Sequence, residues 1–300
     1  MADRRYLVVG GSGYIGARLA QDLALDSQVV VTRRTQSQAR AEWLARAGLG
    51  AVDFDSAAQD SLPVTGSFDA VVNLAMPAAS QAARDPLACR AYAIAAAQAC
   101  LRLLTDGRAK RLLHFSSFHV YGGAARAHYS EEEPAAPQHP YGEIHLACER
   151  LVLAHPNTLV LRPSNIVAAP AHADLGEQAS LLVMDLCRQA ARGAMRLNND
   201  GLSYRDLLPF DDAAAAVRLL LAGQFPAGQA LNLAQGQARR LDDVARLIQR
   251  VAGQPTLEFG TGRDSFRQPF SISTARLQAL GWRPSAELAD EVRQAISFFA

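Results

Sequence analysis

The 300-residue chain contains almost no lysine: Lys110 stands alone, and arginine supplies the rest of the 30 basic residues. These are balanced by 29 acidic residues, for a formal net charge of +1, and they form no basic block. A protein that binds nucleic acid needs a basic surface to neutralise the phosphates. The charge pattern therefore gives nucleic-acid binding no support, and we expect no nucleic-acid partner.

Cysteine and long apolar runs are scarce as well. The four cysteines are scattered without a C-x-x-C pair, which is typical of small buried residues in a reducing compartment, and no metal site is expected. The longest apolar stretch, residues 91–104, contains Gln98 and Arg102, which indicates a packed helix rather than a membrane span. No signal-peptide pattern precedes the first apolar run. We therefore expect a cytoplasmic protein without a membrane partner.

The first half of the chain alternates short apolar runs with amphipathic segments. Continuous apolar runs are typical of parallel strands that are covered on both faces. Repeated strand–helix units predict an α/β fold, a doubly wound parallel Rossmann sheet with right-handed crossovers. Strands are predicted at residues 6–10, 29–32, 69–75, 111–116 and 158–162, with helices at 14–25, 36–47, 88–104 and 141–154.

The pattern loosens beyond residue 163, where a stretch rich in Ala, Pro and His predicts a loop. We expect a dinucleotide-binding domain over residues 1–165, to which part of residues 206–235 returns. Residues 166–300 are expected to form mainly a smaller C-terminal α/β substrate-binding domain, because a chain of this length exceeds the usual size of a single core.

A glycine-rich sequence, GGSGYIG, follows the first predicted strand and opens the first predicted helix. Gly10, Gly13 and Gly16 permit a tight turn and let backbone N–H groups approach a pyrophosphate at the positive end of the helix. Tyr14 and Ile15 belong to the same turn. Because the motif lies between a strand and a helix, it predicts a dinucleotide cofactor; the alternative is a glycine-rich turn without a ligand.

The end of the second predicted strand bears on the choice of cofactor. NAD-selective proteins carry an acidic residue there, whereas this chain has Thr32 followed by Arg33 and Arg34. Two guanidinium groups suit a 2′-phosphate, so NADP is favoured and NAD is the second choice. The alternative is that both are solvated arginines of an arginine-rich protein. Further cofactor contacts are expected from Asp53 and Phe54 at the adenine, and from Leu74, Ala75 and Met76 in the middle of the cofactor.

Several further motifs follow one another in a fixed order: VNLA at 72–75, FSSFHVYG at 115–122, PYGEIH at 140–145, LRPSN at 161–165, YRDLLPFDD at 204–212 and LGWRP at 280–284. Together with the glycine motif, this order resembles the extended short-chain dehydrogenase/reductase family, in its branch of epimerases and dehydratases that modify sugar nucleotides. The resemblance covers essentially the whole chain. It implies an NAD(P)-dependent oxidoreductase or epimerase that acts on a nucleotide-linked sugar.

The resemblance also implies a catalytic set: a Tyr general acid/base, a Ser that binds the reacting oxygen, and a Lys four residues after the Tyr. The matching positions are Tyr141, Ser117 and His145, so the third departs from the family pattern. Residues 141 and 145 lie one turn apart on one helix face, from which both can reach the nicotinamide ribose.

The missing lysine has a physical consequence. A tyrosine pKa of about 10 must fall to about 7 for efficient proton exchange, which corresponds to about 4 kcal/mol. An ammonium group about 4 Å away supplies a comparable energy at an effective dielectric constant of about 20. A histidine is mostly neutral at neutral pH and supplies no such charge. We therefore expect slower turnover, a different acid, or no activity.

His119 lies at the position where the related dehydratases carry a Glu and the epimerase-reductases a Cys. It has suitable acid/base chemistry; the alternative is a histidine that is hydrogen-bonded in the wall of the site. Phe118 and His119 replace the acidic pair of the dehydratases, which weakens a dehydratase function.

The resemblance places substrate contacts at Ser117, His119, Asn165 and Arg205, and a cofactor contact at Pro163. Arg205 suits a diphosphate, and its alternative role is an ion pair with Asp206 or Asp211. Arg263 is aligned more loosely for the same role. A homodimer through helices 88–104 and 141–154 is expected. Two other functions stay open: a dinucleotide-binding sensor or partner subunit with impaired catalysis, and a same-fold reductase of a non-sugar substrate.

Overall fold

The computed structural model describes residues 4–122, 126–178, 181–264 and 266–300. The chain forms two compact units. Unit 1 comprises Met1–Gly122, Pro134–Arg162 and Val217–Leu231, and unit 2 comprises Gly123–Glu133, Pro163–Ala216 and Asn232–Ala300. We expected the boundary at residue 165, whereas the division falls between Arg162 and Pro163. The segment Gly123–Glu133 also belongs to unit 2.

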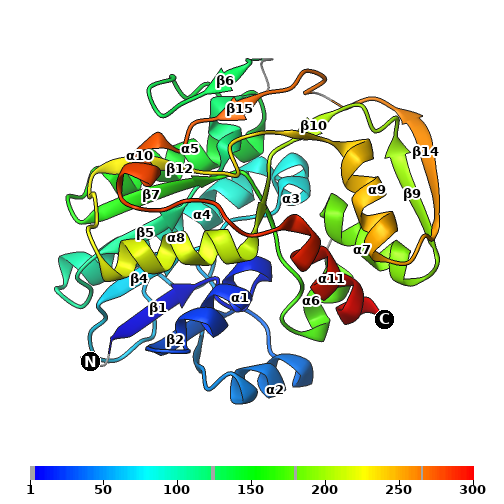
Figure 1. The fold of residues 1–300 in the computed structure, drawn as a ribbon. Coiled ribbons are helices and arrows are strands. Elements are labelled where there is room, and N and C mark those ends of the chain that lie inside the picture. The colour runs from blue at the N-terminus through cyan, green and yellow to red at the C-terminus, as the bar shows by residue number, and fades with distance from the viewer. Residues whose placement is uncertain (1–3, 123–125, 179–180, 265) are drawn as a thin grey trace. The chain divides into compact units, whose positions relative to one another are not determined.

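A seven-stranded sheet organises unit 1, with its strands in the order β12-β7-β5-β4-β1-β2-β3 (Figure 1). All strand pairs from β7 to β3 are parallel, which confirms the predicted doubly wound α/β fold. β4 is buried along its whole length, and so is β7, as expected of strands covered on both faces. The strands are β1 (Arg5–Val9), β2 (Gln28–Arg33), β3 (Gly50–Asp53), β4 (Ala70–Asn73), β5 (Leu112–Phe115), β7 (Thr158–Pro163) and β12 (Gln229–Leu233).

Helices connect these strands as crossovers. α1 has a buried stripe of alanine and leucine along one side, the spacing expected of an amphipathic helix that covers a sheet. The helical elements are α1 (Tyr14–Leu23), α2 (Gln38–Arg46), α3 (Ala79–Arg84), α4 (Pro86–Thr105), the 3₁₀ turn η1 (Phe118–Tyr121), α5 (Pro140–Leu153) and α8 (Phe210–Ala222), the last of which crosses the division between the units.

By length and composition, one helix of the described residues, α4, could cross a membrane. In unit 1 this helix packs against α3, α5, β4 and β5. Packing in a protein core therefore accounts for the same composition.

Unit 2 is made of short two-stranded pairs and helices. Its longest pair, β9 with β14, packs with α7 and α9. The elements are β6 (His128–Tyr129), β8 (Asn165–Val167), α6 (Ala173–Gln178), α7 (Leu182–Ala191), β9 (Ala194–Asn199), β10 (Tyr204–Arg205), β11 (Leu207–Pro209), β13 (Arg239–Arg240), α9 (Leu241–Val251), β14 (Thr256–Gly262), β15 (Ser271–Ile272), α10 (Ala275–Ala279) and α11 (Leu288–Phe299).

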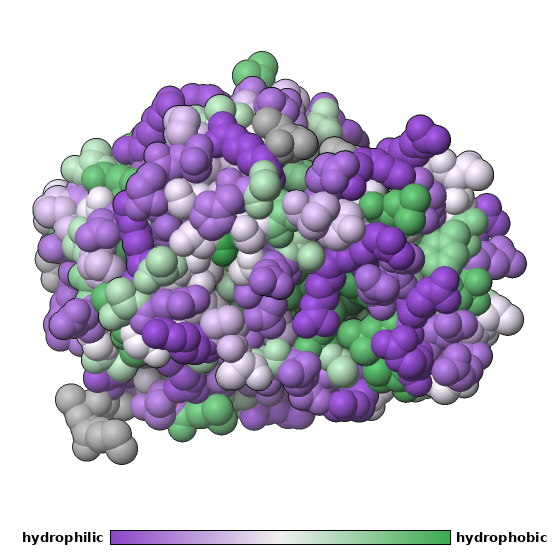
Figure 2. Space-filling model, turned by 45° about the horizontal axis from the view of Figure 1, so that its top comes forward, coloured by the Kyte–Doolittle hydropathy of each residue, from purple (hydrophilic) through white to green (hydrophobic). Residues whose placement is uncertain are grey.

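One face of the molecule is mainly polar. On the face drawn in Figure 2, hydrophilic residues predominate and the apolar residues appear in small, separate areas.

In unit 1, the parallel register places the candidate functional residues at one edge of the sheet. The residues that follow β1, β2, β4 and β5 all lie at carboxyl ends of strands. Ligands of open α/β sheets bind at this edge.

Candidate active site

The glycine turn after β1 leaves no room for side chains. Gly10 has a φ of +78°, and a Cβ there would lie 2.9 Å from the backbone nitrogen of Ala75. A Cβ on Gly16 would lie 2.3 Å from the Gly10 oxygen. Gly13 precedes α1 and provides no side-chain cap. This bare backbone at a helix N-terminus fits the pyrophosphate of a dinucleotide, and a side chain would fill the space.

Thr32 turns inward rather than toward a ligand. Its side chain is buried, and its Oγ1 accepts a hydrogen bond from the Gly10 N–H at 2.9 Å. Thr32 therefore supports the glycine turn. Arg33 is the last residue of β2.

Arg33 is held by the neighbouring strand. Its Nε lies 2.7 Å from Oδ1 of Asp53, and Oδ2 of the same carboxylate accepts a hydrogen bond from Gln36 at 2.9 Å. The hydrogen bond from Arg33 lowers the pKa of Asp53 most, and that from Gln36 lowers it further. The carboxylate is therefore ionised at neutral pH and balances the charge of Arg33. Arg34 is exposed, with its guanidinium 5.5 Å from the ring centroid of Tyr92. Among the described residues, Arg34 has no ion pair, in contrast to Arg33.

The other expected cofactor residues differ in exposure. Phe54 is buried in the core of unit 1, whereas Asp53 is exposed beside it. Ala75 donates its N–H to the side chain of Asn73 at 3.0 Å, which fixes the chain after β4 against the glycine turn. Four further residues of unit 1 are half-buried: Tyr14, Ile15, Leu74 and Met76. Pro163, in unit 2, is buried.

The structure brings the predicted catalytic serine and tyrosine together. The side chain of Tyr141, in the first turn of α5, is hydrogen-bonded to that of Ser117, which precedes η1. Burial raises the pKa of Tyr141, and the hydrogen bond with Ser117 opposes this shift only in part. The phenol is therefore a weak acid that lies beside the hydroxyl of Ser117.

His145 lies beside this tyrosine without a hydrogen bond of its own. Among the described residues, neither of its buried ring nitrogens has a hydrogen-bond partner. Burial lowers the pKa of His145 to about 3, assisted by the nearby His114, His119 and His139. Two orphaned nitrogens at the position where the sequence resemblance implies a lysine fit a ligand that brings its own hydroxyl groups, such as a nicotinamide ribose. As a neutral ring, His145 cannot provide the positive charge of that lysine.

Sequence reasoning missed His139, which belongs to the same group. Its Nε2 lies 3.2 Å from Nδ1 of His119, and its Nδ1 accepts the N–H of Gly142 at 3.2 Å. The ring of His119 in turn lies 5.6 Å from that of Tyr141, centroid to centroid. The only local signal was position, because His139 occupies the N-cap of α5, where Ser, Thr, Asp or Asn is usual.

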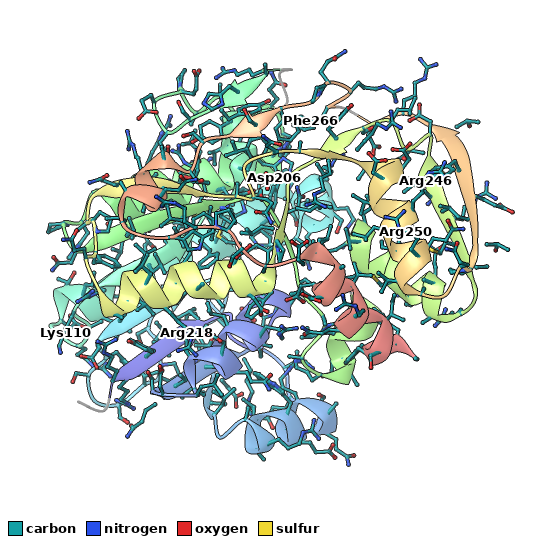
Figure 3. All side chains as sticks on the ribbon, viewed as in Figure 1. Lys110, Asp206, Arg218, Arg246, Arg250 and Phe266 are labelled. Carbon is teal, nitrogen blue, oxygen red and sulfur yellow. The ribbon has the colours of Figure 1, made fainter. Side chains whose placement is uncertain are left out.

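Lys110, the single lysine, does not approach this group. It precedes β5, whereas Ser117 follows that strand, so the two mark opposite ends of β5. Its Nζ lies 2.6 Å from Oδ1 of Asp69, and its side chain is 73% exposed (Figure 3). No group of three or more histidine, cysteine or acidic side chains in the described residues is arranged to hold a metal ion.

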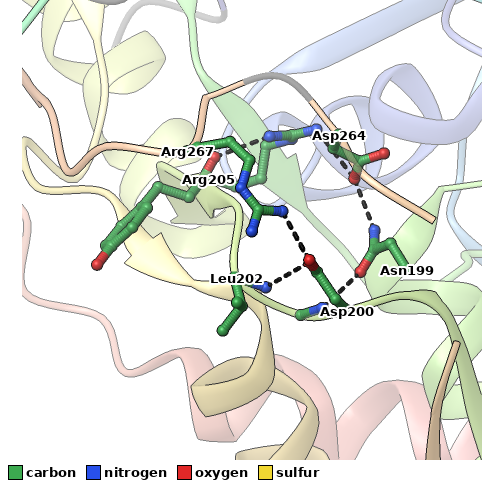
Figure 4. A network of polar contacts seen from close by, with 8 residues as sticks. Asn199, Asp200, Leu202, Arg205, Asp264 and Arg267 are labelled. Atoms are coloured by element: carbon green, nitrogen blue, oxygen red, sulfur yellow. Dashed lines mark hydrogen bonds and ion pairs between the residues drawn. The ribbon is translucent and has the colours of Figure 1, made fainter. Parts of the chain in front are cut away.

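In unit 2, Arg205 belongs to a polar network around Asp264 (Figure 4). Its guanidinium lies 3.5 Å from Oδ2 of Asp264, which also accepts a hydrogen bond from Asn199 at 2.6 Å. The ring of Phe266 lies 5.5 Å from the guanidinium carbon. Sequence reasoning had considered Asp206 and Asp211 as partners of Arg205, and the structure adds Asp264 as an ion-pair partner. Asp264 comes from a distant part of the chain, so no local pattern indicated it.

The other substrate candidates of unit 2 are less constrained. Asn165 is exposed, and its Nδ2 donates to the backbone oxygen of Asp206 at 2.8 Å. The carboxylate of Asp206 is buried and accepts hydrogen bonds from Ser164 and from the N–H groups of Gln235 and Gly236. Asp206 thus organises the loops around Asn165. Arg263 is exposed.

Comparison with known proteins yields one family. The model of the NAD dependent epimerase/dehydratase family matches residues 6–234. Among curated proteins, the chain is 27% identical to dTDP-6-deoxy-L-talose 4-dehydrogenase (NAD(P)(+)) of Kitasatospora kifunensis, over 98% of this chain and 95% of that protein. It is 29% identical to UDP-glucose 4-epimerase of Streptomyces lividans, over 95% of this chain and 93% of that one.

Solved structures share the fold. UDP-N-acetylglucosamine 4-epimerase from Methanobrevibacter ruminantium M1, in complex with UDP-N-acetylmuramic acid, superposes with a TM-score of 0.87 at 18% identity, over 100% of this chain and 99% of the other. RMD from Pseudomonas aeruginosa, complexed with NADPH, gives a TM-score of 0.80 at 24% identity, over 99% and 98%. At these identities the likeness concerns the fold.

Proposed function

Because the chain belongs to the NAD-dependent epimerase/dehydratase family, we propose that it oxidises a carbinol carbon or reduces a keto carbon of a nucleotide-linked sugar, as a reductase or an epimerase. The observation that carries this proposal is the juxtaposition of Tyr141 and Ser117 at the carboxyl edge of the sheet, where α5 packs against η1. The names of the curated relatives, a dTDP-sugar dehydrogenase and a UDP-sugar epimerase, support the choice of substrate.

A bound nicotinamide dinucleotide supplies or accepts the hydride. Tyr141 donates a proton to the reacting oxygen during reduction and accepts it during oxidation. Ser117 holds that oxygen by a hydrogen bond and keeps the phenol aligned with it. His145 lies next to Tyr141 as a neutral ring, on the side where the nicotinamide ribose is expected. Because this ring supplies no positive charge, Tyr141 transfers the proton with a pKa that burial has raised.

We propose NADP as the preferred cofactor, with Arg34 as the residue that binds its 2′-phosphate. Asp53 neutralises Arg33 and holds it at the end of β2, whereas Arg34 is exposed and rests near the ring of Tyr92. A guanidinium whose charge is not balanced by a neighbour is the better phosphate ligand.

For the substrate, we propose that Arg205 of unit 2 binds the diphosphate. The ion pair of Arg205 with Asp264 is longer, at 3.5 Å, than the 2.7 Å pair that neutralises Arg33, so Arg205 keeps more of its charge for a phosphate. Asp264 and Phe266 also restrain its guanidinium, which lowers the entropy lost on binding. A homodimer through α4 and α5, which pack together in unit 1, and a cytoplasmic location stay predictions.

A second function is favoured by one observation, the uncharged environment of Tyr141. A protein that binds the dinucleotide without turnover, as a sensor or partner subunit, would need no cation there. Ser117 and Tyr141 weigh against it, because a sensor has no use for an aligned proton donor.

Calorimetric titration tests the proposal. NADPH and NADH are titrated first, and UDP- and dTDP-linked sugars are then added to the cofactor complex. We expect tight NADPH binding and a nucleotide sugar that binds the complex and turns over. Arg34→Ala should weaken NADPH binding about tenfold, or about 1.4 kcal/mol, and leave NADH binding nearly unchanged. Arg46→Ala, which changes a 70% exposed arginine of α2, is the control.

Ser117→Ala should lower turnover, while Ser80→Ala on the exposed side of α3 should not. Dinucleotide binding without any nucleotide-sugar binding would favour the sensor. Absence of dinucleotide binding would refute both functions.

A further inference from the structure

The N-terminus of α5 determines which nitrogen of His139 carries a proton. The Gly142 N–H points at Nδ1 of His139, at 3.2 Å. A backbone amide can only donate, so Nδ1 must accept and cannot carry a hydrogen. The neutral ring of His139 therefore holds its proton on Nε2.

The same reasoning applies to the ring of His119. Nε2 of His139 lies 3.2 Å from Nδ1 of His119. Since Nε2 carries the hydrogen, it donates, and Nδ1 of His119 accepts. The neutral His119 therefore also holds its proton on Nε2, on the side of the ring away from His139.

Packing keeps both rings in this relation. A Cβ at residue 142 would lie 2.5 Å from the backbone oxygen of His119, so η1 and the first turn of α5 approach as closely as only glycine allows. The backbone N–H of His119 donates to Oγ of Ser117 at 3.2 Å. The ring centroids of His119 and His139 are 5.1 Å apart. The two histidines are thus positioned by backbone contacts on both sides.

Resting on the function proposed above, we propose that His139 is a positioning residue that keeps His119 in the Nε2–H form, so that His119 donates a hydrogen bond to the sugar and does not act as a base toward it. The reaction is then limited to hydride transfer at a carbinol or keto carbon. The hydride passes between that carbon and the nicotinamide, and the hydroxyl proton passes between the oxygen and Tyr141. No C–H bond beside the keto group is broken.

Action as a base would require rearrangement of the pair. A base uses a lone pair, and the lone pair of His119 faces the N–H of His139. To free Nε2 of His119, His139 would have to give up its Nε2 proton and take one on Nδ1, where the Gly142 N–H already points. The ionisable neighbours do not assist, since Tyr141 and His145 of α5 and His114 of β5 are all neutral near pH 7.

Nitrogen-15 NMR of the full chain with labelled histidines tests the tautomers without any substrate. His155 is an internal reference, because its Nδ1 likewise accepts a backbone N–H, that of Asn157 at 3.3 Å. In mildly alkaline buffer we expect His119, His139 and His155 all to show the Nε2–H pattern. His139→Asn keeps a cap for Gly142 and should leave His119 in a mixture of tautomers. An Nδ1–H pattern for His119 in the parent protein would overturn the proposal.

Turnover of a nucleotide sugar in D₂O tests the consequence. We expect no solvent deuterium at the ring carbons next to the reacting carbon. His119→Gln, which keeps a donor, should retain most of the turnover number, while His119→Ala should lose about a hundredfold. His155→Gln is the matched control and should change neither turnover nor binding. Deuterium at a ring carbon, or a glutamine variant as slow as the alanine variant, would contradict the donor role.

The two tests separate this proposal from the proposed function. If no nucleotide sugar turns over, the function fails, whereas the NMR pattern still decides the tautomer of His119. If turnover is found and the tautomer is Nδ1–H, the function stands and the donor role fails.

Discussion

The imidazole ring of His145 meets the phenol ring of Tyr141 nearly edge-on, with the two ring centroids 4.5 Å apart. A lysine at position 145 would place an ammonium group here. Instead, burial raises the pKa of Tyr141 and lowers that of His145 to about 3, so neither group is charged in the resting protein. Neither of these two groups therefore provides a cation for proton transfer.

Replacing His145 with lysine should raise turnover. In the oxidising direction Tyr141 must be deprotonated, and an ammonium group about 4 Å away would stabilise the phenolate by about 4 kcal/mol. We expect the turnover number at pH 7 to rise at least about tenfold, and the limb of the pH profile assigned to Tyr141 to move to lower pH. The profile is measured in the oxidising direction with saturating cofactor. An unchanged profile would show that tyrosine ionisation does not limit the reaction.

Removing the only lysine should leave turnover unchanged. Lys110 and Ser117 lie at opposite ends of β5, separated by about 20 Å of extended chain. Lys110→Gln removes an ion pair with Asp69 in which the lysine side chain is 73% exposed, so its loss changes the free energy of unfolding by less than about 1 kcal/mol. Steady-state kinetics and thermal unfolding check both statements. A large fall in turnover would mean that this lysine serves the active site after all.

Removing the hydroxyl of Tyr141 should abolish proton transfer but spare cofactor binding. In Tyr141→Phe the ring still packs against the cluster of Ile144 and Cys148, while the hydrogen bond with Ser117 is lost. We expect turnover to fall by about 10² to 10⁴ and the dissociation constant for NADPH to stay within about threefold. Calorimetry and single-turnover kinetics measure the two effects. Loss of NADPH binding would mean that the phenol has another role.

Acid should destabilise the protein through its buried histidines. The folded-state pKa of His145 is about 3, below the value of about 6.5 in an unfolded chain. As pH falls from about 6.5 toward 3, the unfolded state gains a proton that the folded state does not, so stability is lost at up to about 1.4 kcal/mol per pH unit.

His145→Met removes one such proton, and the pH dependence of unfolding in this range should become shallower. His114, whose pKa burial lowers to about 4, should maintain part of the slope. Chemical unfolding at several pH values measures this dependence. An identical slope for the variant and the parent protein would argue that His145 is protonated in the folded state.

The glycine turn should tolerate substitution unequally. Gly16→Ala drives a Cβ to within 2.3 Å of the Gly10 oxygen, so we expect a loss of about 1–3 kcal/mol in stability and no measurable dinucleotide binding. At Gly13 the added Cβ would lie 3.2 Å from the same oxygen, so Gly13→Ala should unfold at nearly the parent temperature. Calorimetry and thermal unfolding compare the two. Equal effects would show that close packing does not set the requirement for glycine.

Local patterns determined the architecture and the identity of the proposed catalytic pair. Apolar runs without alternation require strands buried on both faces, and a glycine turn between strand and helix requires a bare helix N-terminus. Motif order then identified Ser117 and Tyr141, which the structure joins by a hydrogen bond. The loss of the family's lysine at position 145 was visible in the sequence too.

Tertiary structure alone decided the partners and protonation of those residues. His119 and His139 are 20 residues apart and meet because η1 packs against the first turn of α5. Arg33 meets Asp53 through the register of β2 and β3, and Arg205 meets Asp264 across 59 residues of unit 2. Periodicity and motifs describe one segment at a time, whereas these contacts depend on how the ends of separate segments pack. The sequence alone therefore named the chemical groups, and packing decided which of them are neutral, which are charged and which nitrogen carries a proton.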